Sequence, residues 1–235
     1  MFQEFLNKIR RRETPFYDTT YRGLDYIRHF NIPTVRPIFL MLYNERQLRR
    51  TFFRLLLTKL YYEPMFRAKC AHVGKRLFLD NSGQVIPEIG GPLRINIGDN
   101  VRIVDRTTFS GLKLLDNPTL DIGDGSSISH GVIILVAKHV SIGKNCTIGA
   151  KLITDNPGHS IKFRENRVKE YFCEDDVKPV IIHDDAWLAA DSMIMKGVEI
   201  GRGAVVGSGA VVTESIPPFS IAVGNPAKIV KSFEH

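Results

Sequence analysis

The chain of 235 residues has three cysteines, one tryptophan and no apolar stretch of membrane-spanning length. Cys70, Cys146 and Cys173 lack the close spacing of a metal site or a disulfide framework, which favours a reducing compartment. The apolar run from Ile38 to Tyr43 is far shorter than the ~20 residues that cross a bilayer. The first fifteen residues contain no apolar signal-peptide core. We therefore predict a cytoplasmic protein without a transmembrane helix.

Acidic residues are scarce at the front of the chain. Residues 1–76 hold sixteen Lys and Arg against six Asp and Glu, whereas residues 77–235 hold sixteen against nineteen. This imbalance predicts a basic N-terminal segment, residues 1–70, with partners different from those of the body. A solvated helical face would explain the charge. The alternative is an acidic surface, such as anionic lipid or a lipid-linked diphosphate sugar; we expect no nucleic acid.

The basic segment is predicted to be helical. Residues 1–30 are typical of short helices or an arm, and Pro33 and Pro37 mark a break. From Pro37 to Lys69 apolar residues share one face, while most arginines lie elsewhere, which predicts a basic amphipathic helix. Its apolar face would pack on the rest of the protein or on a sister subunit. The alternative is peripheral contact with the inner face of a membrane. The apolar face comprises Leu48, Phe52, Leu55, Leu56 and Leu60.

The body of the chain repeats an apolar residue every six positions. A helix repeats near 3.6 residues and a strand at 2, so a strict period of six predicts short strands joined by tight corners. Stacked hexapeptide coils of this kind are typical of a parallel β-helix. The regular positions are Ile182, Leu188, Ile194, Ile200, Val206 and Val212, each followed four places later by a small or apolar residue: Ala186, Ser192, Val198, Ala204, Ala210 and Ile216.

The same period appears earlier in the chain, with interruptions. It slips by two residues near Ala137 to His139 and stops between residues 154 and 180. A long loop in a regular solenoid is costly to order and is more often functional than idle. We predict a mainly β protein: a β-helix over residues 71–216 with the loop 154–180 inserted, and a tail, 217–235, with a Gly-Asn-Pro-Ala-Lys turn. The earlier positions are Ile97, Ile103, Phe109, Ile122, Ile128, Ile134, Ile142 and Ile148.

Several motifs resemble the left-handed β-helix acetyltransferases. They are Ala186-Trp187-Leu188-Ala189, Gly197-Val198-Glu199-Ile200-Gly201, the stretch Ala204 to Val212, and Gly224-Asn225-Pro226-Ala227-Lys228. The resemblance covers roughly residues 70–231. It is greatest to the maltose, galactoside and xenobiotic acetyltransferases and to the surface-polysaccharide sugar O-acetyltransferases. It implies left-handed parallel coils, a homotrimer, and acetyl-CoA as donor; spacing alone would predict none of these.

We expect the catalytic residue where the repeat stops. A histidine titrates near neutral pH, as a general base for a sugar hydroxyl must. Asn156, Pro157 and Gly158 form a turn that would present His159 to a cleft. The resemblance places the general base at the histidine after such a glycine, and His159 matches.

Two further residues are candidates for acceptor binding. Asp155 would orient His159 or bind acceptor hydroxyls, although aspartate before Asn-Pro-Gly is also an ordinary turn former. His130 precedes Gly131 at a corner one coil earlier, and would line the acceptor cleft or serve only as a corner residue.

The resemblance also implies a site for CoA. Ala190 would supply a backbone N–H near the thioester and so stabilise the developing oxyanion. Ser208 and Thr213 would lie along the pantetheine, and Lys228 and Lys231 would meet the nucleotide phosphates. Trp187 would line this groove or pack against a neighbouring subunit.

These residues predict an acetyl-CoA-dependent O-acetyltransferase. Its acceptor would be a sugar hydroxyl of a surface polysaccharide or of a lipid- or nucleotide-linked precursor. Transfer would be direct, because no serine or cysteine stands in a nucleophile-elbow context. An N-acetyltransferase of an amino sugar and a xenobiotic acetyltransferase remain alternatives within the same chemistry.

Two alternatives come from other classes of protein. A β-helix metalloenzyme of the carbonic anhydrase type would need three converging histidines, for which His130, His139 and His159 are the candidates. We expect no metal, because none of the three has a partner at suitable spacing. A non-catalytic scaffold is the other alternative and would not bind acetyl-CoA.

Overall fold

The computed structural model describes residues 2–31, 34–80, 87–113, 115–159 and 173–233. The chain forms two compact units, Met1–Phe52 and Phe53–His235, and each is considered by itself. No helix in the described ranges is both long and apolar enough to cross a membrane.

The N-terminal part is helical, as the pattern of apolar residues predicts. Helix α1 spans Phe2–Arg11 and α2 spans Pro15–His29, whose first turn is capped by the Thr14 hydroxyl. Helix α3 spans Arg36–Leu57 and continues through a π-helical turn, Thr58–Tyr62, into α4, Glu63–Lys69. The predicted helix from Pro37 to Lys69 is therefore confirmed, with its last turns distorted.

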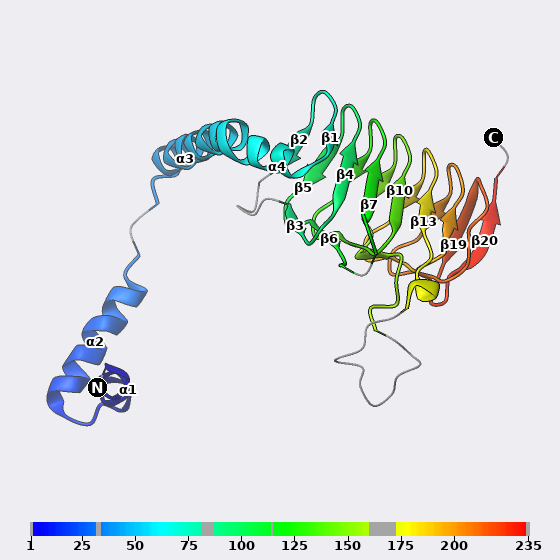
Figure 1. Cartoon of the computed structure of the whole chain (residues 1–235). Helices are drawn as coiled ribbons and strands as arrows, with labels where there is room; N and C mark the ends of the chain where they lie inside the picture. The colour runs from blue at the N-terminus through cyan, green and yellow to red at the C-terminus, as the bar shows by residue number, and fades with distance from the viewer. Residues whose placement is uncertain (1, 32–33, 81–86, 114, 160–172, 234–235) are drawn as a thin grey trace. The chain divides into compact units, whose positions relative to one another are not determined.

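The rest of the second unit is a parallel β-helix. As far as β18 the chain visits three sheets in rotation, so that each strand pairs with the one three strands further along, and in sheet B β17 then pairs with β19 and β19 with β20 (Figure 1). Sheet A contains β1 His72–Val73, β4 Arg94–Ile97, β7 Thr119–Ile122, β10 His139–Ile142, β13 Val180–Ile182 and β16 Glu199–Ile200. Sheet B contains β2 Phe78–Asp80, β5 Arg102–Val104, β8 Ser127–Ile128, β11 Thr147–Ile148, β14 Trp187–Leu188, β17 Val205–Val206, β19 Ser220–Val223 and β20 Lys228–Ser232. Sheet C contains β3 Glu88–Gly90, β6 Thr108–Gly111, β9 Ile133–Val136, β12 Leu152–Thr154, β15 Met193–Ile194 and β18 Val211–Val212.

The period of six is the period of the core. All twelve regular positions between Ile182 and Ile216 are at most 4% exposed. Ile182 pairs with Ile200, eighteen residues on, which is one coil of three six-residue faces. Since each short strand turns one apolar side chain inward and the corner contributes a small one, stacked coils fill a continuous core.

The coil continues beyond Ile216, the boundary expected from the sequence. Pro217 and Pro218 form a corner rather than an end, and β19 then pairs with β17 in parallel. Strand β20 folds back on β19 in the antiparallel direction. The period of six does not predict this coil, because the coil is shorter than eighteen residues. Val206 pairs with Ala222, sixteen residues on.

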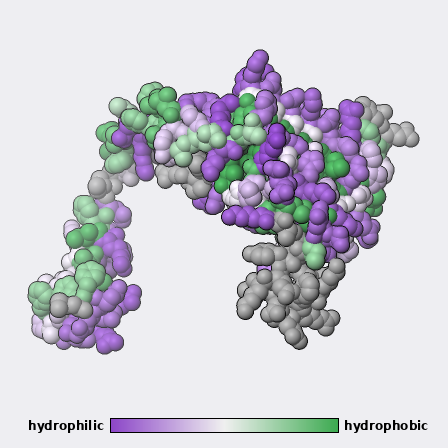
Figure 2. All heavy atoms as spheres, viewed as in Figure 1, coloured by the Kyte–Doolittle hydropathy of each residue, from purple (hydrophilic) through white to green (hydrophobic). Residues whose placement is uncertain are grey.

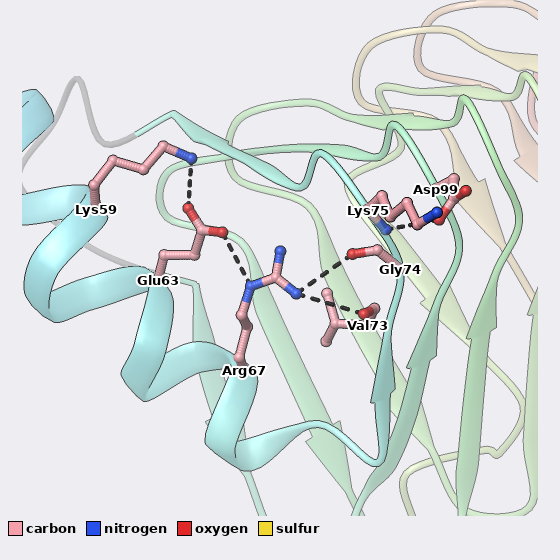
Figure 3. A network of polar contacts seen from close by, with 7 residues as sticks. All are labelled: Lys59, Glu63, Arg67, Val73, Gly74, Lys75 and Asp99. Atoms are coloured by element: carbon pink, nitrogen blue, oxygen red, sulfur yellow. Dashed lines mark hydrogen bonds and ion pairs between the residues drawn. The ribbon is translucent and has the colours of Figure 1, made fainter.

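Helix α4 closes the first coil of the β-helix. Phe66 is 2% exposed and belongs to the same apolar cluster as the coil interior. Glu63 binds Lys59 (Oε2 to Nζ, 2.6 Å) and Arg67 (Oε1 to Nε, 3.0 Å). The Arg67 guanidinium in turn donates to the carbonyl oxygens of Val73 and Gly74 (Figure 3). These contacts satisfy backbone groups that the outermost coil would otherwise leave without partners.

Helix α3 keeps its apolar side chains exposed. None of its residues is buried, and Figure 2 shows hydrophobic residues gathered along this helix. Arginines lie on the same helix at positions 36, 46, 49, 50 and 54. The exposed apolar side chains include Ile38, Phe39, Leu40, Met41, Leu42, Tyr43, Leu48, Phe52, Phe53, Leu55, Leu56 and Leu57.

Candidate functional site

One corner of the coil carries a column of stacked residues. Each lies two positions after a buried residue of sheet B, and the strand register places one above the next. Backbone hydrogen bonds join levels, from Gly131 N–H to the Asp105 carbonyl (3.2 Å) and from Gly209 N–H to the Ala190 carbonyl (3.0 Å). We call this set the corner column; it consists of Asp105, His130, Ala150, Ala190 and Ser208.

Two members of the corner column offer backbone donors. Ala190 and Ser208 are exposed, and neither backbone N–H has a hydrogen-bond acceptor among the residues that the structure describes. The Trp187 side chain, on the strand before Ala190, is 52% exposed. An exposed N–H without an internal partner can bind a carbonyl or thioester oxygen. The structure thus brings two of the predicted CoA residues to adjacent levels of one edge.

The C-terminal turn lies against strand β18. Val211 donates its N–H to the Gly224 carbonyl (2.9 Å), and the Ala227 N–H donates to the Val211 carbonyl (2.8 Å). Thr213 follows β18 directly and is exposed, as are Lys228 and Lys231 on β20. The Lys228 ammonium lies 3.9 Å from a Glu214 carboxylate oxygen, so it remains largely available to other anions.

Asp155 anchors the beginning of the long loop. It is fully buried, and its carboxylate accepts hydrogen bonds from the backbone N–H groups of Ala137 (2.7 Å), Lys138 (2.6 Å) and His139 (2.9 Å). The Asn156 side-chain amide donates to the same carboxylate (3.0 Å). The Asp155 carbonyl accepts from Lys178 N–H (2.9 Å), at the far end of the loop. These contacts are those of an anchor; they do not support acceptor binding by Asp155.

His159 follows a tight turn at the exposed mouth of the loop. The Asn156 side-chain oxygen accepts from Gly158 N–H (3.0 Å), and Gly158 has a φ of +76°, which glycine adopts readily. His159 is exposed. Residues 160–172 lie outside the described residues. The described part of the chain resumes at Cys173, which is followed by the 3₁₀ turn Glu174–Asp176.

Within one chain, the turn that carries His159 begins at the opposite end of sheet C from the corner column. Ala150 precedes β12 and Asp155 follows it, and β12 itself occupies residues between them. Five residues of extended chain span on the order of 15 Å. Within one chain, the start of the His159 turn and the corner column are therefore separated by the length of a sheet C strand.

Three other histidines of the β-helix pair with carboxylates. His130 Nδ1 lies 2.6 Å from Asp105 Oδ1, His139 Nε2 2.8 Å from Asp121 Oδ2, and His183 Nε2 2.6 Å from Glu199 Oε1. Among the described residues, no three His, Cys, Asp or Glu side chains are gathered as a metal site requires.

Asp105 is the residue that the sequence did not reveal. It lies 25 residues before His130, because Ile103 pairs with Ile128. The regular coil of eighteen residues gives no hint of that partner.

Two family models match parts of the chain. The model described as bacterial transferase hexapeptide (six repeats) matches residues 179–214, and the hexapeptide repeat of succinyl-transferase matches residues 139–153. Both matches fall on coils of the β-helix.

Curated relatives match over part of their length. A protein of Schizosaccharomyces pombe assigned as an acetyltransferase is 30% identical over 149 residues, which are 63% of this chain and 61% of that protein. The 2,3,4,5-tetrahydropyridine-2,6-dicarboxylate N-acetyltransferase of Staphylococcus aureus (strain JH9) is 45% identical over 53 residues, 23% of this chain and 22% of that enzyme. The chain thus covers less than two thirds of these relatives.

Solved structures share the fold. The polysialic acid O-acetyltransferase OatWY is 26% identical with a TM-score of 0.50, covering 69% of this chain and 88% of that one. A mutant of AntD, an N-acyltransferase from Bacillus cereus, in complex with dTDP and coenzyme A, has a TM-score of 0.55. The similarity covers 73% of this chain and 89% of that one. At 22% identity, this second similarity concerns the fold alone.

Proposed function

We propose that the chain is an acetyl-CoA-dependent O-acetyltransferase of the hexapeptide-repeat family, which the matching family models and the similar acetyltransferases support. Its acceptor is a sugar hydroxyl of a surface polysaccharide or of a lipid- or nucleotide-linked precursor. The observation that carries the proposal is that one chain presents both an exposed loop histidine, His159, and backbone N–H donors without an internal acceptor at Ala190 and Ser208. The similarity to OatWY, a polysialic acid O-acetyltransferase, supports a sugar as acceptor.

The proposed reaction is a direct transfer. His159 takes the proton of the acceptor hydroxyl as its oxygen attacks the carbonyl carbon of the acetyl thioester. The Ala190 N–H stabilises the negative charge that develops on the carbonyl oxygen. When the carbon–sulfur bond breaks, the proton on His159 passes to the departing sulfur, and CoA leaves as the thiol.

The donor would lie along the corner column. Ser208 and Thr213 would contact the pantetheine, and Lys228 and Lys231 would bind the phosphates, which prefer charged donors. Three of these residues lie near the turn that holds Gly224 and Ala227 against Val211.

The complete site requires two chains in this proposal. Asp155, where the His159 turn begins, and the corner column are on the order of 15 Å apart along one chain, farther than a histidine side chain reaches. In a homotrimer of left-handed coils, the loop of one subunit would face the corner column of the next. A closed cyclic assembly makes three such sites.

The test is to replace His159 by Ala and follow CoA release in the presence of acceptor. We expect turnover to fall by about 10²–10⁴-fold, the usual contribution of a general base. His183→Ala is the matched control, because that exposed imidazole pairs with Glu199 away from the corner column. Near wild-type turnover by His159→Ala would exclude the mechanism. Acceptors that offer an amine should react poorly; preferential acetylation of an amino sugar or of a xenobiotic would establish the corresponding alternative.

We further propose that α3 binds the inner face of an anionic membrane. The helix exposes apolar side chains beside five arginines, a combination that suits acyl chains and lipid phosphates together. A solvated helix would not leave so many large apolar groups in water.

Sedimentation with vesicles tests the membrane proposal. The protein should bind phosphatidylserine-containing vesicles and should bind pure phosphatidylcholine vesicles much more weakly. The double variant Leu48→Asp and Phe52→Asp should abolish binding, whereas Gln47→Asp, on the same helix, should weaken it only slightly. Equal binding to both vesicle types, or binding unaffected by the double variant, would refute the proposal.

A further inference from the structure

A second imidazole stands in the corner column beside the proposed donor site. We propose that His130, held by the buried carboxylate of Asp105, contacts a second hydroxyl of the acceptor and selects acceptors that carry one. This inference rests on the proposed acetyl transfer and adds to it the acceptor contact and the residue that positions it.

The pairing determines which nitrogen of His130 faces outward. Asp105 Oδ1 lies 2.6 Å from His130 Nδ1. Because an ionised carboxylate only accepts hydrogen bonds, we assign the Nδ1–H tautomer to the His130 ring. The lone pair of Nε2 is then the free acceptor, and it suits the O–H group of a ligand.

The burial of Asp105 distinguishes this pair from the other two. The Asp105 side chain is 3% exposed, and its histidine is 54% exposed. The carboxylates that pair with His139 and His183 are 38% and 58% exposed, so water competes for both. Only at His130, among the described histidines, is an exposed ring fixed from beneath by a buried anion.

The position of His130 matches the size of a sugar. Ile128 pairs with Ile148, which pairs with Leu188, so His130 and Ala190 stand two coils apart. Two strand spacings amount to about 10 Å. Ala150 occupies the level between them, and its small side chain belongs to the apolar core of the coil.

This interval accommodates an acceptor between the two groups. An acetyl carbonyl bound at the Ala190 N–H would place its reacting carbon at one end. A hexose ring, roughly 5 Å across, with hydrogen-bonding contacts of about 3 Å at each end would reach Nε2 of His130. The hydroxyl at Nε2 is therefore a different one from the hydroxyl that is acetylated. His159 remains the group that removes the proton of the reacting hydroxyl.

Steady-state kinetics with p-nitrophenyl glycosides as acceptors test the inference. His130→Phe keeps an aromatic ring but removes the acceptor nitrogen, and we expect the acceptor KM to rise about tenfold. The KM for acetyl-CoA and the rate of acetyl-CoA hydrolysis without acceptor should remain within about twofold of wild type. His139→Phe is the matched control, since it removes an imidazole paired to a carboxylate outside the corner column.

Asp105 is tested as a positioning residue. In Asp105→Asn, the ¹⁵N spectrum of His130 should show loss of the Nδ1–H tautomer, and the acceptor KM should rise with little change in kcat. A purely structural role would lower the thermal midpoint without this spectral change. An analogue that lacks the second hydroxyl should react with wild type and His130→Phe equally well.

The outcomes separate the two proposals. If the wild-type protein acetylates none of the glycosides, the proposed sugar acetyl transfer itself is refuted. If wild type acetylates them and His130→Phe, folded as judged by its thermal midpoint, keeps the wild-type acceptor KM, the role of His130 is refuted. An equal rise in both substrates' KM would also refute it.

Discussion

At the scale of single residues, Asp155 shows how one buried carboxylate shapes the site. It binds three consecutive backbone N–H groups at the corner where the repeat slips, and its carbonyl joins the two ends of the loop. The turn that presents His159 begins at the next residue. The loop is therefore anchored by a residue that has no contact with solvent.

Replacing Asp155 by Asn should destabilise the protein. The amide keeps one acceptor oxygen and turns its NH₂ toward backbone donors, so at least one buried N–H loses its partner. We expect the free energy of unfolding to fall by about 2–4 kcal/mol, which lowers the thermal midpoint by roughly 5–10 °C. Thermal unfolding measures this. Asp175→Asn is the control, because Asp175 is exposed at the other end of the loop and should leave the midpoint unchanged. Equal midpoints for both variants would contradict the anchoring role.

At the scale of elements, ion pairs and hydrogen bonds connect α4 to the first coil. Burial alone would raise the pKa of Glu63, but its hydrogen bonds to Lys59 and Arg67 outweigh that effect and lower the pKa below its ordinary value. Arg67 carries the interaction on to the carbonyls of Val73 and Gly74. The ionised form of Glu63 thus stabilises the docked helix.

The docking of α4 should depend on pH through Glu63. A carboxyl group with a lowered pKa in the folded state contributes stability above its unfolded pKa, and this contribution is lost as the pH falls through the lowered folded pKa. Glu63→Gln should therefore lower the thermal midpoint at pH 7, and this deficit should shrink as the pH is lowered toward 3. Glu45→Gln, which removes an exposed pair with Arg49, serves as the control. A Glu63→Gln deficit that stayed constant from pH 7 to pH 3 would contradict this linkage.

At the scale of the whole molecule, the separation of His159 from Ala190 predicts complementation between inactive variants. His159→Ala lacks the proposed base, and Ala190→Glu places a negative charge beside the proposed site of the oxyanion. Each variant alone should be inactive. In mixed trimers formed from equal amounts, a site between neighbours draws one residue from each chain, so about a quarter of the sites are intact.

The measurement is acetyl transfer after the two variants are unfolded together and refolded. We expect about a quarter of the activity of wild type treated in the same way. Light scattering should give a mass of about three chains, each of 26.5 kDa. Absence of any recovered activity in a verified mixed trimer would place both residues in one chain's site.

The amino-acid sequence determined the repeating part of this protein. Burial in a coil depends on which of six neighbouring residues is apolar, so positions such as Leu188 and Val206 revealed the core without any long-range information. The break in the repeat likewise marked the loop that carries His159. Helix α4 followed from local periodicity, although its contact with the first coil did not.

Only the tertiary structure decided which side chains meet across coils. In the interrupted region the paired residues are 25, 20 and 40 positions apart, at Ile103–Ile128, Ile128–Ile148 and Ile148–Leu188. With no constant coil length, the sequence could not place Asp105 under His130, nor Asp155 at the corner of Ala137. The sequence motifs predicted that His159 and Ala190 belong to one site. In the fold, the turn that carries His159 begins at the other end of sheet C from the corner column that contains Ala190. The reason is physical: the local pattern specifies which residues turn inward, whereas the length of each coil specifies what lies above and below.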